Sequence, residues 1–249
     1  MLKFLTAGAL ALGLVLSAPA SARVSEEFSR TLPLPSDGAF SVVNVNGSVE
    51  VEIWDRDEVQ IDATKQAKDR ETLDRTQIEI NASKGRIEVV TRLPKGKQSG
   101  SVSYRVKVPA GVSVDAKSVN GAVAVSGVLG GVDAQTTNGA LTLREVAGEV
   151  EASTTNGALH VSHSALPSSG SHRYSTTNGA VEVSLPSSAS GNFTAKTVNG
   201  KIRTDFPLEV HTTRWGRNSS IDGTLGDGGA SFDFQTVNGS IEIDEISGR

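Results

Sequence analysis

An Asn-Gly dipeptide recurs seven times in this chain of 249 residues and constrains the fold more than any other feature. Apolar and polar residues alternate on both sides of it, as in Val132-x-Ala134-x-Thr136 before Asn138-Gly139. This period of two predicts a strand, a turn and a second strand. Asparagine and glycine both tolerate positive φ, so each turn is expected to be tight, and Gly139→Val should destabilise the fold for that reason. The predicted turns are Asn46-Gly47, Asn120-Gly121, Asn138-Gly139, Asn156-Gly157, Asn178-Gly179, Asn199-Gly200 and Asn238-Gly239.

The spacing of the turns distinguishes two all-β architectures. Successive asparagines from Asn120 to Asn199 lie 18, 18, 22 and 21 residues apart. An antiparallel β-meander sandwich would use each dipeptide as a hairpin, whereas a β-solenoid would stack the turns at about 4.8 Å. We favour the solenoid, a right-handed β-helix-like stack of coils of about 19 residues, because stacking requires a nearly fixed coil length.

Like residues also recur at like positions, which supports stacking. Small residues before the turns should face bulky aliphatic residues after them across a thin core. Longer gaps predict further coils, about eleven in all, with degenerate turns at Lys84-Gly85 and Asn218-Ser219. An internal ladder of hydroxyls is expected from Ser118, Thr136, Thr154, Thr176, Thr197 and Thr236.

The N-terminus predicts export. Lys3 precedes an apolar run from Phe4 to Leu16, and Ala20-Ser21-Ala22 fits a signal-peptidase site. We therefore expect a signal peptide at 1–22, cleaved after Ala22, with the bond after Ala20 as the alternative. An N-terminal segment or cap at 23–36 and a single β-repeat domain at 37–249 would follow. The C-terminus follows the last repeat strand directly, which leaves end-to-end self-association open.

Composition excludes several classes of function. The chain has no cysteine, which removes disulfides, thiol catalysis and cysteine-bound zinc. Its net charge of −4 argues against a nucleic-acid partner. After the signal peptide, no apolar stretch is long enough to span a membrane.

The turn motif resembles the bacterial adhesin-like family of β-strand-repeat proteins, a domain family of unknown function. The segment from Val51 to Val59 is similar to its early strand and turn, and Val108-Pro109-Ala110-Gly111 to its entry into regular repeats. The segments starting at Ile221 and Thr236 are similar to its closing coils. The resemblance covers most of the mature chain. It implies a β-helix-like stack and an envelope location, and it supplies no catalytic residues or cofactors.

Individual candidate sites are few. His160 and His163 should face opposite sides of a strand, so they are not expected to share a metal. Asp222 and Asp227 flank a glycine-rich segment that occurs once, which favours a surface turn over a calcium site. Parallel β-helices can carry carbohydrate-active sites, yet no paired-carboxylate or nucleophile motif stands out. Outward positions after the turns form a smooth strip, which fits a simple repeat face of small residues or, alternatively, a contact surface for a partner. The strip consists of Ala122, Ala124, Ala140, Thr142, Ala158 and Ala180.

These observations predict a non-enzymatic exported envelope protein, periplasmic or on the cell surface, that acts as an adhesin-like binding module or interaction scaffold. Its expected partner is an envelope or cell-surface protein or a glycan. The alternatives are a self-assembling structural element, a β-helix carbohydrate-active enzyme and a component of an envelope-stress sensor.

Overall fold

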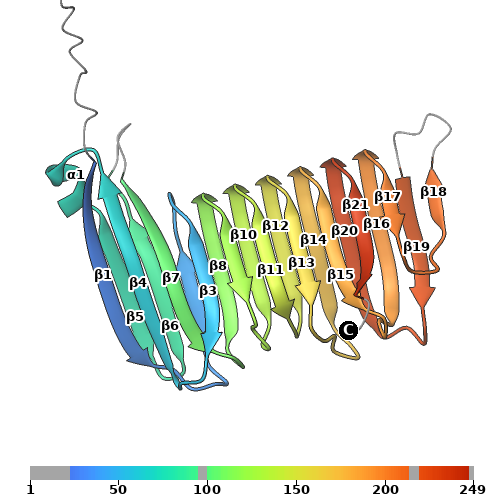
Figure 1. The fold of residues 1–249 in the computed structure, drawn as a ribbon, viewed down its shortest axis with the longest axis horizontal. Helices are drawn as coiled ribbons and strands as arrows, with labels where there is room; N and C mark the ends of the chain where they lie inside the picture. Colours follow the sequence, from blue (N-terminus) through green and yellow to red (C-terminus); the bar gives the residue numbers. More distant parts are fainter. Residues whose placement is uncertain (1–22, 95–99, 213–218, 247–249) are drawn as a thin grey trace, which may run out of the picture.

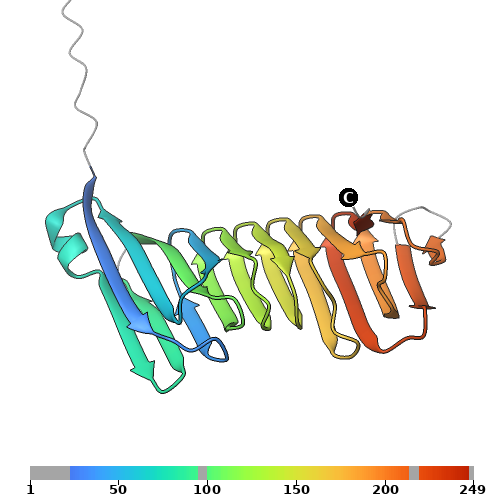
Figure 2. The same cartoon turned by 60° about the horizontal axis from the view of Figure 1, so that its bottom comes forward.

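The computed structural model describes residues 23–94, 100–212 and 219–246, so the predicted signal peptide lies outside the described residues. Two β-sheets lie face to face in an elongated stack (Figures 1 and 2). In spatial order, sheet A consists of β1 (Val24–Pro33), β4 (Glu58–Ala67), β7 (Ser101–Pro109), β3 (Val49–Trp54), β9 (Val123–Ser126), β11 (Leu141–Val146), β13 (Leu159–His163), β15 (Val181–Pro186), β21 (Ile241–Ile246) and β17 (Ile202–Thr204). Sheet B consists of β5 (Gln77–Ser83), β6 (Arg86–Arg92), β2 (Ala39–Val43), β8 (Ser113–Asn120), β10 (Val132–Asn138), β12 (Val150–Asn156), β14 (Ser171–Asn178), β20 (Ala230–Asn238), β16 (Gly191–Asn199), β19 (Ser219–Leu225) and β18 (Val210–Thr212).

The repeated unit is one coil, in which a strand of sheet B, an Asn-Gly turn and a strand of sheet A follow one another. Equivalent strands of neighbouring coils pair in parallel. Thr136 of β10 lies beside Thr154 of β12, and Leu141 of β11 lies beside Leu159 of β13. The Asn-Gly turns therefore stack on one another instead of closing hairpins. The predicted solenoid-like fold is confirmed, and the antiparallel meander is wrong.

The order of the coils in the stack differs from their order in the chain. The last coil, β20–β21, lies between β14–β15 and β16–β17, and β2–β3 lies between β6–β7 and β8–β9. In the part of the chain that the structure describes, seven coils with an Asn-Gly turn contribute a strand to each sheet, and β6 and β7 extend the two sheets by one more strand each beyond β2–β3. The expectation of about eleven coils stacked in chain order is wrong, because the long gaps between turns also hold antiparallel strands at both ends of the stack.

The predicted coil corner at Lys84-Gly85 is wrong. Lys84-Gly85 closes a hairpin between β5 and β6, and Gly85 has the positive φ, 73°, that suits a two-residue hairpin turn. Ser219 begins β19, which runs antiparallel to β16, while Asn218 lies outside the described residues. The C-terminal strand β21 pairs with β15 on one side and with β17 on the other. The last repeat strand of the chain therefore does not form an open end of the stack, as its position in the sequence had suggested.

The core between the sheets follows the predicted alternation. Thr136 and Thr154 are buried, and their hydroxyls donate to the carbonyl oxygens of Gly121 and Gly139 on the neighbouring coil, at 2.9 and 3.1 Å. The expected hydroxyl ladder is therefore present. Toward the C-terminal end, aromatic rings enter two rows of the core. Tyr174 and Phe234 stand in the alanine row, between Ala152 and Ala195, and Phe232 and Phe193 follow His172 in the row two residues earlier. All four rings are at most 1% exposed.

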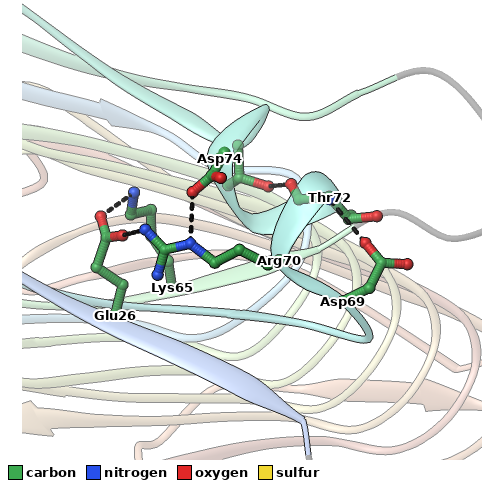
Figure 3. Close-up of polar contacts among 7 residues, drawn as sticks. Glu26, Lys65, Asp69, Arg70, Thr72 and Asp74 are labelled. Carbon is green, nitrogen blue, oxygen red and sulfur yellow. Dashed lines mark hydrogen bonds and ion pairs between the residues drawn. The ribbon is translucent and has the colours of Figure 1, made fainter.

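The charged segment before Gln77 forms the end of β4 and the short helix α1 (Arg70–Asp74). Figure 3 shows the ion pairs that hold the helix against β1: Arg70 contacts Glu26 of β1 at 3.4 Å and Asp74 at 2.8 Å. Lys65 of β4 also forms an ion pair with Glu26. Asp69 caps the helix by accepting a hydrogen bond from the Thr72 backbone N–H at 2.8 Å. Strand β1 forms the outer edge of sheet A, where it pairs antiparallel with β4.

Candidate functional site

The seven turn asparagines form one hydrogen-bonded row, here called the asparagine ladder. In six of them, Nδ2 donates to the Oδ1 of an asparagine on the neighbouring coil, at 2.8–2.9 Å, while the Nδ2 of Asn46 donates to the carbonyl oxygen of Gly100 at 3.2 Å. A side-chain amide has two N–H donors, and the ladder uses one, so the members from Asn120 to Asn238 keep a donor facing solvent. In spatial order the ladder runs Asn46, Asn120, Asn138, Asn156, Asn178, Asn238 and Asn199.

Glycine is required beside the ladder for a reason other than the predicted one. Among the seven turn glycines only Gly47 has a positive φ, 113°. A Cβ added to Gly139 would lie 2.2 Å from the carbonyl oxygen of Gly121, and one added to Gly157 would lie 1.9 Å from that of Gly139. Six of the glycines are therefore needed because the backbone of the next coil leaves no room for a side chain.

The turns together make one side of the stack, here called the turn wall. It consists of residues 45–48, 119–122, 137–140, 155–158, 177–180, 237–240 and 198–201. Seven coils at the interstrand spacing give it a length of about 30 Å. Its exposed β-branched side chains include Val119, Val198 and Val237, which are 42%, 48% and 41% exposed. Lys201 is its only charged residue, although 21% of the whole chain is charged.

The predicted contact strip divides between two surfaces. Ala122, Ala140, Ala158 and Ala180 belong to the turn wall. Ala124 and Thr142 lie on the outer face of sheet A instead, in a lateral row with Glu50, His160 and Glu182.

In that row, His160 is exposed as expected, and its Nδ1 lies 2.8 Å from Oε2 of Glu182. The pair borders a depression of about 440 Å³ that Arg144 and Asp244 also line. Burial raises the pKa of Asp244, and the nearby carboxylates of Asp205 and Glu182 add to this effect. Among the described residues, no hydroxyl is hydrogen-bonded to the His160 ring, so a nucleophile–base pair is not assembled.

The outer face of sheet B carries a groove of about 420 Å³ across its strand starts, with acidic side chains along it. Cations partly neutralise these groups. Lys117 contacts Asp115 and Asp133 at 3.1 and 3.3 Å, and Arg173 lies 3.9 Å from Glu151. The charges therefore pair with one another across the coils.

The remaining histidines show what sequence reasoning missed. His163 points into the core, on the opposite face from His160 as predicted, and meets His172 edge-to-face with ring centroids 5.2 Å apart. Its Nε2 lies 2.6 Å from the Tyr174 hydroxyl, and the His172 ring stacks on Phe232. Burial lowers the pKa of His163 to about 3, with a smaller contribution from His172. The alternation of β14 places His172 inward, and this signal could have identified the pair.

Asp222 and Asp227 are both exposed, on β19 and in the turn after it. Within the described ranges, no group of three or more acidic or histidine side chains is arranged to hold a metal ion. In the same residues, no helix has the length and hydrophobicity to cross a bilayer.

Three solved structures are similar to this chain. A candidate cell adhesion protein from Clostridium sporogenes matches with a TM-score of 0.50 and 12% identity, over 90% of this chain and all of that one. Candidate adhesins from Bacteroides fragilis and Parabacteroides distasonis match with TM-scores of 0.40 and 0.34, at 8% and 12% identity, over 89% of this chain and 97% of each of theirs. No curated protein matches significantly. The family model of the Toastrack domain DUF4097 matches residues 26–244, and the chain belongs to this family.

Proposed function

We propose that this protein is a non-enzymatic, exported binding module of the cell envelope, and that its turn wall is the contact surface. The observation that carries the proposal is the near absence of charge from the turn wall. Depletion of charged residues distinguishes the centres of protein interfaces from ordinary surface. The description of the Clostridium sporogenes structure as a candidate cell adhesion protein agrees with this role.

The turn wall is also preorganised. The asparagine ladder fixes its amides, and the buried threonine hydroxyls fix the backbone beneath them. Little conformational entropy is lost when such a surface binds, which favours affinity from modest contacts. The free amide donors, alternating with methyl groups of alanine, threonine and valine, suit an uncharged partner with hydroxyl or amide groups, such as an envelope glycan.

Charge insertion tests this assignment. The triple variant T137E/T155E/T177E places carboxylates on three exposed positions of the turn wall. The control Q135E/S153E/S175E places the same charges two residues earlier, on the outer face of sheet B. Binding of the labelled protein to intact cells and to arrayed neutral glycans should be lost in the first variant and retained in the second. Equal loss in both variants, or cleavage of any glycan, would contradict the proposal.

End-to-end self-association is a second proposal, favoured by the shape of one end of the stack. In the described residues, sheet A ends at β17, which has three residues, whereas sheet B continues with β19 and β18. The outer edge of β17 can accept a strand from another copy. Light scattering should then show a mass that rises with concentration, and a constant monomer mass would refute it.

A further inference from the structure

Asn-Gly pairs carry a chemical liability that is independent of any ligand. The backbone nitrogen of the glycine can attack Cγ of the asparagine. A new N–Cγ bond then closes a five-membered succinimide, the Cγ–Nδ2 bond breaks, and ammonia leaves. Water opens the ring to aspartate or isoaspartate. The reaction requires a glycine nitrogen free of other partners and an asparagine side chain that can rotate over it.

In six of the seven pairs, the stack leaves neither the glycine nitrogen nor the asparagine side chain free for this reaction. The N–H groups of their glycines donate to an asparagine carbonyl oxygen on the neighbouring coil, at 2.9–3.2 Å. Reaching the attack geometry at these turns requires breaking this bond together with the ladder, which means opening the coil locally. The protected glycines are Gly47, Gly121, Gly139, Gly157, Gly179 and Gly239.

Asn199-Gly200 stands at the end of the ladder. Asn199 donates to Oδ1 of Asn238 at 2.8 Å, but in the described part of the chain its own Oδ1 accepts no ladder bond. Within the same part, the Gly200 N–H has no hydrogen-bond acceptor. The Asn199 side chain is exposed to water. We propose that Asn199 is the site of spontaneous deamidation in the folded protein, and that the stack protects the other six pairs.

The product changes the end of the turn wall. A carboxylate at position 199 replaces the amide that donates to Asn238, so the last ladder bond is lost. Isoaspartate also lengthens the backbone of the turn between β16 and β17, the short edge strand of sheet A. Deamidation should therefore loosen β17 first and leave the central coils unchanged.

The test is a peptide map of the folded full chain after long incubation at mildly alkaline pH in ¹⁸O-water, which labels every carboxylate formed by ring opening. Label should accumulate at Asn199 and stay near background at the other six asparagines. A parallel incubation in urea should label all seven at comparable rates. The variant N199Q should abolish the signal at this position in the folded protein and leave the other six unlabelled.

Two results would overturn the inference. One is labelling of Asn138 or Asn156 at the rate of Asn199 in the folded protein. The other is the same preference for Asn199 in urea, because local sequence and not the stack would then set the rate. Binding to cells or glycans does not enter the readout, so this test and that of the turn wall fail independently.

Discussion

Replacing Gly139 by alanine tests the close approach of the coils with one methyl group. The added Cβ would lie 2.2 Å from the Gly121 carbonyl oxygen and 2.9 Å from the Ala122 nitrogen. Both atoms are backbone, so no side chain can move aside, and the coils must separate locally by more than 1 Å to reach ordinary contact. Overpacking of this kind costs about 1–3 kcal/mol.

Separation of the coils also stretches the hydrogen bonds next to the turn. The Thr136 hydroxyl donates to that same Gly121 oxygen, and the Asn138 amide donates to Asn120. At about 1 kcal/mol each, their loss brings the expected destabilisation to about 3–5 kcal/mol. For a chain of this size the melting temperature should fall by about 6–20 °C.

The matched control is Gly131→Ala. The closest atom to a Cβ there is the Glu149 carbonyl oxygen at 3.6 Å, and the φ of Gly131 is not positive. This variant should stay within about 1 kcal/mol of the parent and can gain stability from a less flexible unfolded chain. Urea titration of both variants measures the difference. Equal midpoints would refute the close-approach explanation for the turn glycines.

Three further predictions address the core and the order of coils. Thr154→Val removes the buried hydroxyl and should cost about 1–2 kcal/mol in urea titrations, whereas Thr155→Val on the exposed face should cost almost nothing. Because burial lowers the pKa of His163 from 6.5 to about 3, the unfolded chain binds a proton that the folded chain does not. The free energy of unfolding should therefore fall by about 1.4 kcal/mol for each unit by which the pH is lowered from 6.5 toward 3. His163→Phe should flatten this pH profile, whereas His160→Gln should not. Truncation after Gly229 removes β20 and β21 and should leave everything after β15 sensitive to protease, whereas a sequential stack would lose only its last coil.

The sequence predicted the coil and its buried positions because they depend on local periodicity. A period of two and a nearly constant repeat place Thr136 and Thr154 at one depth, whichever coils become neighbours. The ladder itself follows from the same register, since identical side chains must meet when the coils stack in parallel. The expected role of glycine, a positive φ, is wrong at six turns, because the Asn-Gly dipeptide by itself indicates only a hairpin turn and not the close approach of a neighbouring coil.

At the C-terminal end, the order of the coils agrees with side-chain volume, which periodicity does not report. The rings of His172 and Phe232 stack at 4.7 Å, and those of Phe232 and Phe193 at 4.5 Å, so coils with large rings lie next to one another. Central coils hold valine or alanine in the corresponding rows. All three rings stand six residues before an asparagine of the ladder, but so does Phe40, which lies beside Ile87 and Val114, so this position alone does not reveal the order.

Insertion of the last coil has an energetic consequence. In a simple solenoid the terminal coils have one neighbour each, so they fray first. Here β20–β21 has a coil on both sides, and Asn238 is bonded to both Asn178 and Asn199. Its release must break two interfaces at once, while antiparallel strands occupy both ends of sheet B. Because β20–β21 cannot leave without separating β14–β15 from β16–β17, these three coils should unfold cooperatively and not one at a time.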